Sequence, residues 1–305
     1  MNAVAEIARL KKERHAVILA HNYQLPEVQD IADYTGDSLG LSLEAAKTKA
    51  EVIIFCGVYF MAETAKIISP EKTVVIPDPT AGCPMADMVS AAQLRELKAR
   101  HPQAKVVCYV NTTAEVKAEC DVCCTSANAV LILKKLKKEA AEIIFVPDKY
   151  LAGYAAQKAG CAVIPWPGYC PTHARILPEH IVKLKQERPM AKVIVHPECN
   201  GLVVALADAA LSTAGMIKYA SENDAEEFIV ATETGMLHGL RKACPRKRFY
   251  PVSEEIVCPN MKKTTLEKVL RALQTLEFQV ELPGEIINRA RLPIQRMMDW
   301  TKKND

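Results

Sequence analysis

Features that would place this chain in a membrane or nucleic-acid-binding class are missing from its sequence. Half of its 305 residues are hydrophobic, yet no stretch reaches the roughly 20 apolar residues that a membrane-spanning helix needs. The formal net charge is only +3, too close to zero to favour nucleic acid or an anionic membrane as a partner. The N-terminus is charged from Glu6 onward and has no apolar signal-peptide core. We therefore expect a cytoplasmic protein with no membrane and no nucleic-acid partner.

Low-complexity segments and long linkers are also missing, but cysteine is not scarce. In a chain expected in the cytoplasm, eleven cysteines do not point to a disulfide framework. Cys56 and Cys108 lie in apolar, strand-like runs, where packing in a core explains them. Cys120, Cys123 and Cys124 form a Cys-x-x-Cys-Cys motif with no second pair at zinc-finger spacing. For this motif we favour a structural or accessory redox role.

One dipeptide recurs with a nearly constant period. It stands at Cys83-Pro84, Cys170-Pro171 and Cys258-Pro259, which are 87 and 88 residues apart. The same period relates the ends of three apolar runs and three hydroxyl residues, namely His21, Tyr109 and His196, and Ser38, Ser126 and Thr213. Landmarks that share a period indicate repeated units, and a unit of this length has room for its own small core. We therefore predict one α/β unit built three times.

Short apolar runs alternate with helical patterns along the chain, which is typical of parallel sheets covered by helices on both faces. We predict an α/β fold of three pseudo-threefold-related, three-layer α/β/α domains, whose small parallel sheets surround a central site. The expected boundaries are 1–86, 87–174 and 175–260, with helices of 261–305 packing back against the first domain. In the first domain we expect a short helix over 29–35, followed by a helix capped by Asp37 or Ser38.

The carboxyl ends of the predicted strands are where a site is expected. Open parallel sheets bind ligands beyond these ends, and all three periodic Cys-Pro loops follow such ends. Three converging thiolates can hold zinc with an open position, or a [4Fe–4S] cluster in which one iron lacks a protein ligand. Cys244 also precedes a proline but breaks the period, so we interpret it as structural.

Polar residues gather at the same strand ends. They are His21, Tyr23, Tyr109, Asn111, His196 and Glu198, at related positions in the three units. Their convergence favours a site over isolated structural residues. Ser38, Ser126 and Thr213 stand at or near predicted helix starts. Each alone would be an ordinary N-cap, but three converging helix N-termini would form an anion site for phosphate or carboxylate.

Ten short segments carry a more specific signal. They are His21-Asn-Tyr23, Gly36-Asp-Ser38, Gly82-Cys83-Pro-Met-Ala, Tyr109-Val-Asn111-Thr, Cys124-Thr-Ser126-Ala-Asn, Pro167-Gly-Tyr-Cys170-Pro-Thr-His173, His196-Pro-Glu198-Cys, Ser212-Thr213-Ala-Gly215, Thr232-Glu-Thr-Gly235 and Cys258-Pro-Asn-Met261-Lys. The match runs over nearly the whole chain, and in this order the segments resemble the quinolinate synthase family. The resemblance implies an enzyme of NAD biosynthesis that condenses iminoaspartate with dihydroxyacetone phosphate to quinolinate, with loss of phosphate and two waters.

The resemblance also implies a cofactor and a partner. A [4Fe–4S] cluster would be held by Cys83, Cys170 and Cys258, the same three cysteines that the period selects. Its open iron would act as a Lewis acid. The substrate iminoaspartate is unstable, so the resemblance points to a functional link to an L-aspartate-oxidising enzyme.

Roles for single residues follow from the same resemblance. Glu198, Tyr23 and His21 are the candidates for acid–base catalysis. Tyr109, Asn111, His196 and Thr213 would bind or orient substrate carboxylates, while Ser38 and Ser126 would hold the phosphate. His173, three residues after Cys170, would either line the site or support the cluster from outside its ligand set.

Two other classes stay open on the residues alone. A non-catalytic cluster carrier would need a fully ligated cluster and no substrate pocket, which the polar residues beside an incomplete ligand set argue against. A zinc-dependent lyase or hydrolase would use the same three cysteines. Zinc gives no visible absorption, so the colour of the protein separates zinc from iron.

Overall fold

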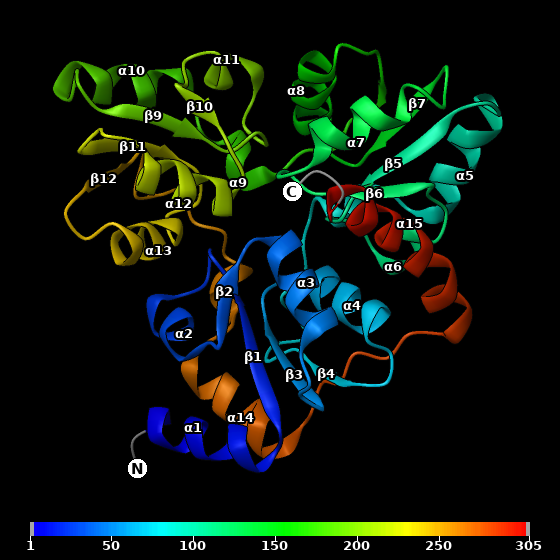
Figure 1. Cartoon of the computed structure of the whole chain (residues 1–305), viewed down its shortest axis with the longest axis vertical. Coiled ribbons are helices and arrows are strands. Elements are labelled where there is room, and N and C mark those ends of the chain that lie inside the picture. Colours follow the sequence, from blue (N-terminus) through cyan, green and yellow to red (C-terminus); the bar gives the residue numbers. More distant parts are fainter. Residues whose placement is uncertain (1–2, 303–305) are drawn as a thin grey trace.

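The computed structural model describes residues 3–302 and contains three four-stranded parallel sheets. Figure 1 shows them as three lobes that meet near the centre, each with helices against its sheet. Parallel strands buried on both faces need continuous apolar sequence, and β3 (Val52–Cys56) and β7 (Ile143–Val146) are buried at every position. The α/β class with three small parallel sheets is therefore confirmed. No helix within residues 3–302 is long and apolar enough to cross a membrane.

We call the segments that carry the three sheets units one, two and three. Unit one contains β1 (Ala16–His21), β2 (Tyr34–Gly36), β3 and β4 (Thr73–Val75), with α1 (Ala3–Glu13), α2 (Pro26–Ile31), α3 (Ser38–Lys47), α4 (Tyr59–Ile68) and the 3₁₀ turn η1 (Ala86–Met88). Unit two contains β5 (Lys105–Tyr109), β6 (Val122–Cys124), β7 and β8 (Ile164–Pro165), with α5 (Ala91–Arg100), α6 (Ala114–Lys117), α7 (Ala129–Leu136), α8 (Lys149–Ala159) and α9 (Pro171–Ala174).

Unit three contains β9 (Lys192–Val195), β10 (Ala209–Ala210), β11 (Glu227–Ala231) and β12 (Arg248–Pro251), with α10 (Pro178–Glu187), α11 (Gly201–Val204), α12 (Thr213–Glu222), α13 (Met236–Ala243) and the 3₁₀ turn η2 (Met261–Lys263). The chain ends with α14 (Leu266–Thr275) and α15 (Gly284–Lys302). The strand orders are β2-β1-β3-β4, β6-β5-β7-β8 and β10-β9-β11-β12. All three sheets thus have one topology, with the second strand of each unit at an edge.

A repeated aspartate fixes each of these edge strands. Asp33, Asp121 and Asp208 stand immediately before β2, β6 and β10, and they are 88 and 87 residues apart. One carboxylate oxygen of each accepts a backbone N–H from the neighbouring first strand at 2.8 Å, donated by Ile18, Val106 and Val193. The other oxygen pairs with Lys11, Lys105 and Lys192. The three units therefore share the period of the sequence and also the hydrogen bond that fixes each edge strand.

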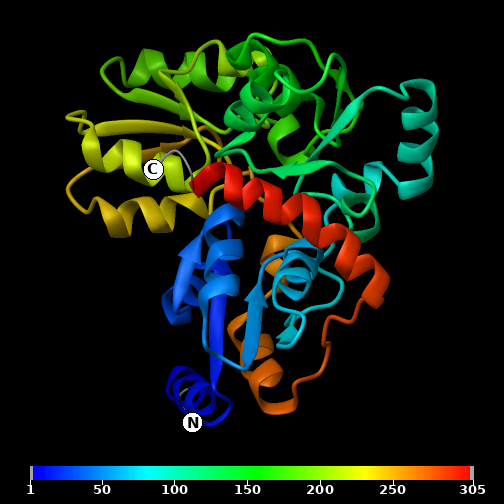
Figure 2. The same cartoon turned by 45° about the vertical axis from the view of Figure 1, so that its right-hand side comes forward.

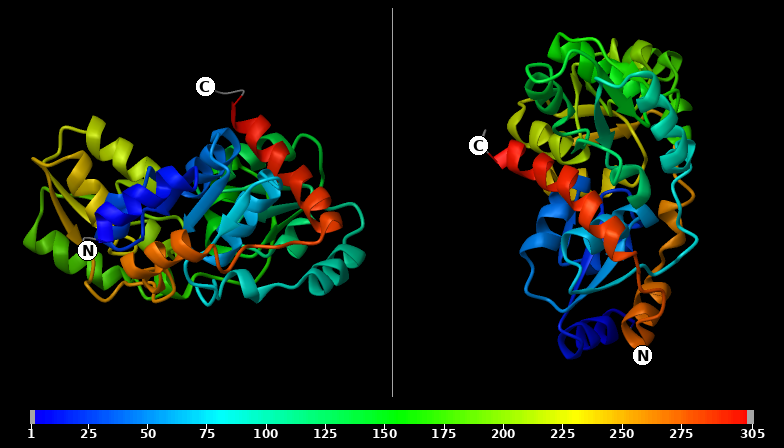
Figure 3. Two further views of the ribbon diagram at one scale, coloured as in Figure 1. Left: turned by 90° about the horizontal axis from the view of Figure 1, so that it is seen from below. Right: turned by 90° about the vertical axis from the view of Figure 1, so that its right-hand side faces the viewer.

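One expectation about a single element was wrong, and the contacts of the C-terminal helices extend beyond the unit that was expected. The helix expected over 29–35 ends at Ile31, and Tyr34–Gly36 instead forms the edge strand β2, which pairs with β1. The C-terminal helices were expected to pack back against unit one, and α14 does so through α1 and β3 (Figure 3). In contrast, α15 packs mainly against α6 and β6 of unit two and also touches α4 of unit one. Figure 2 shows it lying diagonally across the junction of the two units. The exact unit boundaries stay predictions.

One hydrophobic core runs through all three units. It includes Ile53 of unit one, Phe145 of unit two, Phe228 of unit three and Met297 of α15, all buried. Smaller buried clusters lie beside β1 in unit one and beside β9 in unit three. The packing of the units against one another places the carboxyl ends of their strands around a common centre.

Candidate active site

A cavity of about 150 Å³ lies where the three units meet, and all thirteen residues predicted for a site line it. They are His21, Tyr23, Ser38, Cys83, Tyr109, Asn111, Ser126, Cys170, His173, His196, Glu198, Thr213 and Cys258. Val58, Phe60 and Met61 add an apolar wall. A concave site with a few converging polar groups is typical of small-molecule binding. The functional roles of the individual residues stay predictions.

The three Cys-Pro loops share one local structure, a short helical turn that begins within three residues of the cysteine. The turns are η1 after Cys83, α9 after Cys170 and η2 after Cys258. Burial raises the pKa of each cysteine, and backbone N–H groups that follow it oppose this shift, namely those of Met85 and Ala86, of His173, and of Asn260 and Met261. Proline suits the start of such a turn because its φ is already helical and no N–H is needed there. The N–H groups favour the thiolate form of each cysteine.

The donor set of these loops fits a cationic group larger than one ion. Burial raises the pKa of Cys83 to about 12 and raises those of Cys170 and Cys258, so thiolates here require a cation beside them. A tetrahedral zinc with Zn–S bonds of about 2.3 Å would hold its sulfurs about 3.8 Å apart. Within residues 3–302 these three sulfurs do not all lie within 4.8 Å of one another. An iron–sulfur cluster separates its ligands further, so the cysteines fit a cluster better.

A more compact donor group stands beside the cysteines. Ligand atoms of Cys170, His173 and Glu198 lie within 4.8 Å of one another. Hydrogen bonding accounts for this proximity, because Nδ1 of His173 lies 2.8 Å from Oε2 of Glu198 and 3.2 Å from the sulfur of Cys170. The imidazole therefore links the cysteine loop to the carboxylate.

Glu198 is a buried carboxylate with two strong partners. Its Oε1 accepts the phenol proton of Tyr109 at 2.6 Å, and its Oε2 faces His173. Burial alone would raise the pKa of Glu198, but His173, His196 and Tyr109 lower it below its ordinary value. Burial raises the pKa of Tyr109 well above its ordinary value. At neutral pH the pair is therefore a carboxylate next to a protonated phenol.

A hydrogen-bond chain connects Glu198 to Tyr23 across the units. With Nδ1 of His173 donating to Glu198, its Nε2 is an acceptor. Thr232 Oγ1 lies 2.8 Å from this Nε2 and gives its single proton there. The phenol of Tyr23, 2.5 Å from Thr232 Oγ1, then donates to Thr232. The chain can pass a proton from Tyr23 to Glu198 without moving a heavy atom far.

His21 and His196 occupy equivalent positions in units one and three. In both, the backbone N–H two residues later donates to Nδ1, from Tyr23 at 3.2 Å and from Glu198 at 3.4 Å. The proton of each neutral ring therefore sits on Nε2, which in His196 donates to Ser126 Oγ at 3.1 Å. Burial lowers the pKa of His21 to about 3 and that of His196 to about 4. Both rings are neutral donors at pH 7.

Two helix N-termini reach the cavity, rather than the three expected. Ser38 opens α3 and Thr213 opens α12, each a ten-residue helix. First-turn N–H groups carry partial positive charge and favour anions. Ser126 lies near a helix start, as expected, but in the turn before α7, which begins at Ala129. Ser126 still lines the cavity, through its hydroxyl rather than a helix start.

Sequence reasoning gave no role to Glu233, a carboxylate with no exposed surface. It accepts the N–H of Gly235 at 2.8 Å and that of Cys258 at 3.1 Å. It also pairs at 2.9 Å with Lys262, whose ammonium donates to the backbone oxygen of Tyr23. A Cβ at Gly235 would meet Glu233, Lys262 and Tyr23 at 2.8 Å. This carboxylate therefore positions the third cysteine loop and the Tyr23 segment together, and the polar run after β11 was the available signal.

Comparison with known proteins adds a finding independent of this geometry. The model of a family described as quinolinate synthetase A protein matches residues 5–299. Relatives named quinolinate synthase include one from Dehalococcoides mccartyi (strain CBDB1), 58% identical over 293 residues and 96% of each chain. Another, from Methanosarcina barkeri (strain Fusaro), is 53% identical over 295 residues, 97% of this chain and 96% of the relative. The matched range contains all thirteen predicted site residues.

Proposed function

Because the chain belongs to the quinolinate synthetase A family of enzymes, we propose that it condenses iminoaspartate with dihydroxyacetone phosphate to form quinolinate. The pyridine ring takes its nitrogen from the imine and its carbons from both substrates, while phosphate and two waters leave. The product would enter NAD biosynthesis, and an L-aspartate-oxidising enzyme would supply the imine. The observation that carries the proposal is the meeting, in one cavity, of three cysteine loops and the chain from Tyr23 to Glu198.

Cys83, Cys170 and Cys258 would hold a [4Fe–4S] cluster with one iron lacking a protein ligand. When bound, the cluster supplies a Lewis acid for the loss of hydroxyl groups. The support from this chain is the repeated turn whose backbone N–H groups oppose the rise in the pKa of each cysteine. Glu233 would hold the Cys258 loop in position relative to the other two cysteine loops.

The Tyr23–Glu198 chain would carry the proton transfers. Enolisation releases a proton from carbon, and dehydration needs a proton at the departing oxygen. A proton taken up at Tyr23 displaces the phenol proton onto Thr232, the Thr232 proton onto Nε2 of His173, and the Nδ1 proton onto Glu198. Glu198 can then return it to substrate through Tyr109, which is 2.6 Å away. The same hydrogen-bond chain would thus take up a proton as a base and deliver a proton as an acid.

Other lining groups would bind the substrates. His21 and His196 present neutral N–H donors for carboxylates. The side-chain oxygen of Asn111 is buried and has no hydrogen-bond partner among residues 3–302, so a substrate N–H or O–H would satisfy it. The hydroxyls of Ser38 and Ser126, with the N-terminus of α3, would hold the phosphate.

The first experiment is an anaerobic purification followed by iron, sulfide and zinc analysis, a visible spectrum and an assay for quinolinate from the two substrates. We expect a brown protein with roughly four irons per chain, the content of one [4Fe–4S] cluster, that forms quinolinate. A colourless protein with one zinc, or a brown protein that forms no quinolinate from the two substrates, would overturn the proposal.

Cysteine variants sharpen the test. Replacing Cys83, Cys170 or Cys258 by serine should each remove the brown colour and the activity. Cys244→Ser is the matched control. Cys244 also precedes a proline, but it is the C-cap residue of α13, and its sulfur contacts the hydroxyl of Ser221. Cys244→Ser should keep both colour and activity. Retention of the cluster in any of the three ligand variants would contradict the assignment.

A further inference from the structure

The three cysteine loops contact one another at their ends. Between these contacts the Cys83 loop spans 80–88, the Cys170 loop 166–175 and the Cys258 loop 255–263. The last residue of each loop, five positions after the cysteine, forms a hydrogen bond with the first residue of the next loop. The pairs are Met88 with Trp166, Arg175 with Glu255, and Lys263 with Thr80. The three loops therefore follow one another in a closed circle.

The first contact joins unit two to unit one. Nε1 of Trp166 donates to the backbone oxygen of Met88 at 2.8 Å, and the backbone N–H of Tyr169 donates to the Met88 sulfur at 3.3 Å. Gly168 permits this approach, because a Cβ there would meet the backbone oxygen of Pro147 at 2.4 Å and Cβ of Met88 at 3.3 Å. The indole N–H is a donor only, so phenylalanine in place of Trp166 keeps an aromatic ring and removes the bond.

Two cationic side chains make the other contacts. The guanidinium of Arg175 donates to the backbone oxygen of Glu255 at 2.6 Å and joins unit two to unit three. The ammonium of Lys263 donates to the backbone oxygen of Thr80 at 2.7 Å and joins unit three back to unit one. Hydrogen bonds from charged donors are stronger than those from neutral donors. All three pairs of units are thus linked beside the cysteines.

The contact of Lys263 has a second support. Nζ of Lys268 donates to the backbone oxygen of Lys263 at 2.9 Å and pairs with the carboxylate of Asp78 at 2.6 Å. The other carboxylate oxygen of Asp78 accepts the N–H and the hydroxyl of Thr80 at 2.8 and 2.7 Å. Loss of Lys263 alone would therefore leave its loop attached, and the other two contacts are the better places to cut the circle.

We propose that these contacts close the cysteine loops into one ring, in which Trp166, Arg175 and Lys263 are positioning residues that set the spacing of the three sulfurs. Each cysteine lies between two contacts that are eight or nine positions apart. The prolines that follow the cysteines are exposed, so the contacts hold a side of the loops that core packing does not. This role rests on the proposed function, because a cluster requires fixed sulfur spacing, whereas the ring itself does not.

Loss of visible absorption tests the positioning role. The cluster-loaded enzyme is mixed with an iron chelator without oxygen, and the rate of bleaching is measured. Arg175→Met and Trp166→Phe should each bleach roughly tenfold faster than the parent, the lower end of the cost of removing groups that orient metal ligands. Arg175→Lys keeps a cationic donor and should restore most of the resistance to the chelator. Bleaching of both Arg175→Met and Trp166→Phe at the parent rate would overturn the proposal.

Two comparisons separate a ring from general stability and from independent contacts. Arg14→Met is the matched control, because Arg14 is an exposed arginine that donates to the backbone oxygen of Gln274 at 2.9 Å, outside the cysteine loops. It should bleach like the parent. In a double variant, Arg175→Met with Trp166→Phe, independent contacts would multiply to roughly 100-fold. A ring opened by one cut loses little more on the second, so the double variant should bleach at nearly the rate of the faster single variant. A 100-fold effect would overturn the ring.

Amide hydrogen exchange tests the ring itself. Mass spectrometry follows exchange in the three loops of the parent and of Arg175→Met, each as purified. We expect faster exchange in 80–88 as well as in 166–175 and 255–263, because an open ring also frees the loop that Arg175 does not touch. Acceleration confined to the last two loops would overturn the proposal. If the parent contains no iron–sulfur cluster, the proposed function fails, and hydrogen exchange in that protein still decides the ring.

Discussion

Thr232 is the residue that joins the two halves of the proposed proton chain. Among the described residues, only the hydroxyl of Thr232 connects Tyr23 to Nε2 of His173 through contacts shorter than 3 Å. Thr232→Val keeps the shape of this buried side chain and removes the hydroxyl. We expect kcat to fall by roughly 100-fold or more, the contribution typical of acid–base catalysis, with little change in KM. Steady-state kinetics on the cluster-loaded enzyme measure this.

Two further variants separate chemistry from packing at this residue. Thr232→Ser restores the hydroxyl and should recover most of kcat. Thr264→Val is the matched control, because the hydroxyl of Thr264 is fully buried and has no partner within residues 3–302. It should leave kcat near the parent value. A Thr232→Val enzyme as active as the parent would exclude the chain from catalysis.

Glu63 provides a pH-dependent prediction at the same scale. Burial raises its pKa from an ordinary 4.5 to about 7, with Lys117 opposing the shift and Glu115 and Asp87 adding to it. The folded chain therefore binds more protons than the unfolded chain between these values, and the stability from this group is lost as pH rises through about 7. A shift of this size corresponds to about 3 kcal/mol. Glu63→Gln should abolish this loss.

The measurement compares the free energy of unfolding of parent and variant at about pH 5 and about pH 8. Glutamine keeps an acceptor for the N–H of Ala114, which Glu63 binds at 3.1 Å. Glu63→Gln should gain stability relative to the parent as pH rises, whereas Glu115→Gln, an exposed neighbour, should not. An equal pH dependence in parent and Glu63→Gln would contradict the raised pKa.

Residues marked by a period or a known motif were predictable, and residues that act through distant partners were not. The period selects Cys83, Cys170 and Cys258 because repeated units place equivalent loops at one centre. Glu233 was missed because its partners, Cys258 and Lys262, become its neighbours only after unit three folds. Cys108 shows the same limit, because its buried sulfur lies 2.9 Å from Thr112 Oγ1, a contact that its apolar strand does not indicate.

At the scale of single elements, the short edge strands depend on side chains as well as on pairing. Asp208 accepts the N–H of Val193 at 2.8 Å and fixes β10, which has only two residues, beside β9. Asp208→Ala leaves that part-buried N–H without its acceptor, and we expect a loss of about 1–3 kcal/mol of unfolding free energy. Denaturant unfolding of the two proteins measures it.

Lys192 separates the backbone bond from the ion pair. Its ammonium binds the other oxygen of Asp208 at 2.8 Å, but its side chain is 44% exposed. Exposed pairs contribute little, so Lys192→Ala should cost less than about 1 kcal/mol. If the lysine variant costs as much as Asp208→Ala, the ion pair rather than the backbone bond fixes the edge strand.

These edge strands also explain where element prediction from sequence stopped. Continuous apolar runs such as Val52–Cys56 predict central strands, because helices cover both faces of a parallel sheet. β2 has three residues and β10 only two, too few to show any alternation. Their positions follow from tertiary pairing with β1 and β9. For the same reason the packing of α15 against unit two, in addition to its contact with α4 of unit one, was not predicted, because an apolar stripe does not reveal which surface it will cover.

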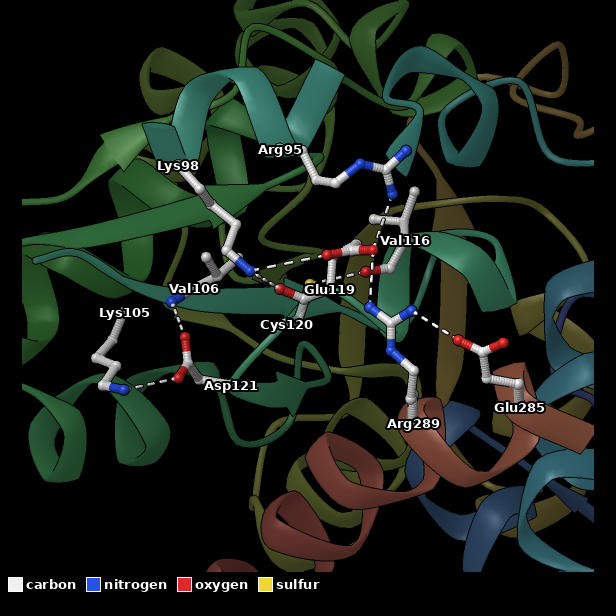
Figure 4. A network of polar contacts seen from close by, with 10 residues as sticks. All are labelled: Arg95, Lys98, Lys105, Val106, Val116, Glu119, Cys120, Asp121, Glu285 and Arg289. Carbon is white, nitrogen blue, oxygen red and sulfur yellow. Dashed lines mark hydrogen bonds and ion pairs between the residues drawn. The ribbon is translucent and has the colours of Figure 1, made fainter. Parts of the chain in front are cut away.

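At the scale of the whole molecule, three sheets do not mean three independent folding units. The continuous core contains buried residues of all three units and of α15. α15 also binds unit two at its polar face, where Arg289 reaches Glu119 (Figure 4). Multidomain chains often unfold in several steps, but a shared core couples the units. We therefore expect the three units to unfold together.

Ile294→Ala in α15 tests this coupling. Ile294 is fully buried in the shared core, so truncation should cost about 2–5 kcal/mol, whereas Leu292→Ala, at a residue 72% exposed, should cost almost nothing. The two tryptophans, Trp166 and Trp300, lie in unit two and α15 and none lies in 175–260. Fluorescence therefore reports one side of the molecule and far-ultraviolet circular dichroism reports all of it. With a shared core both midpoints should fall together in Ile294→Ala. A fluorescence transition that moves alone would mean that unit three keeps its fold without α15, and that the cavity is assembled from separable parts.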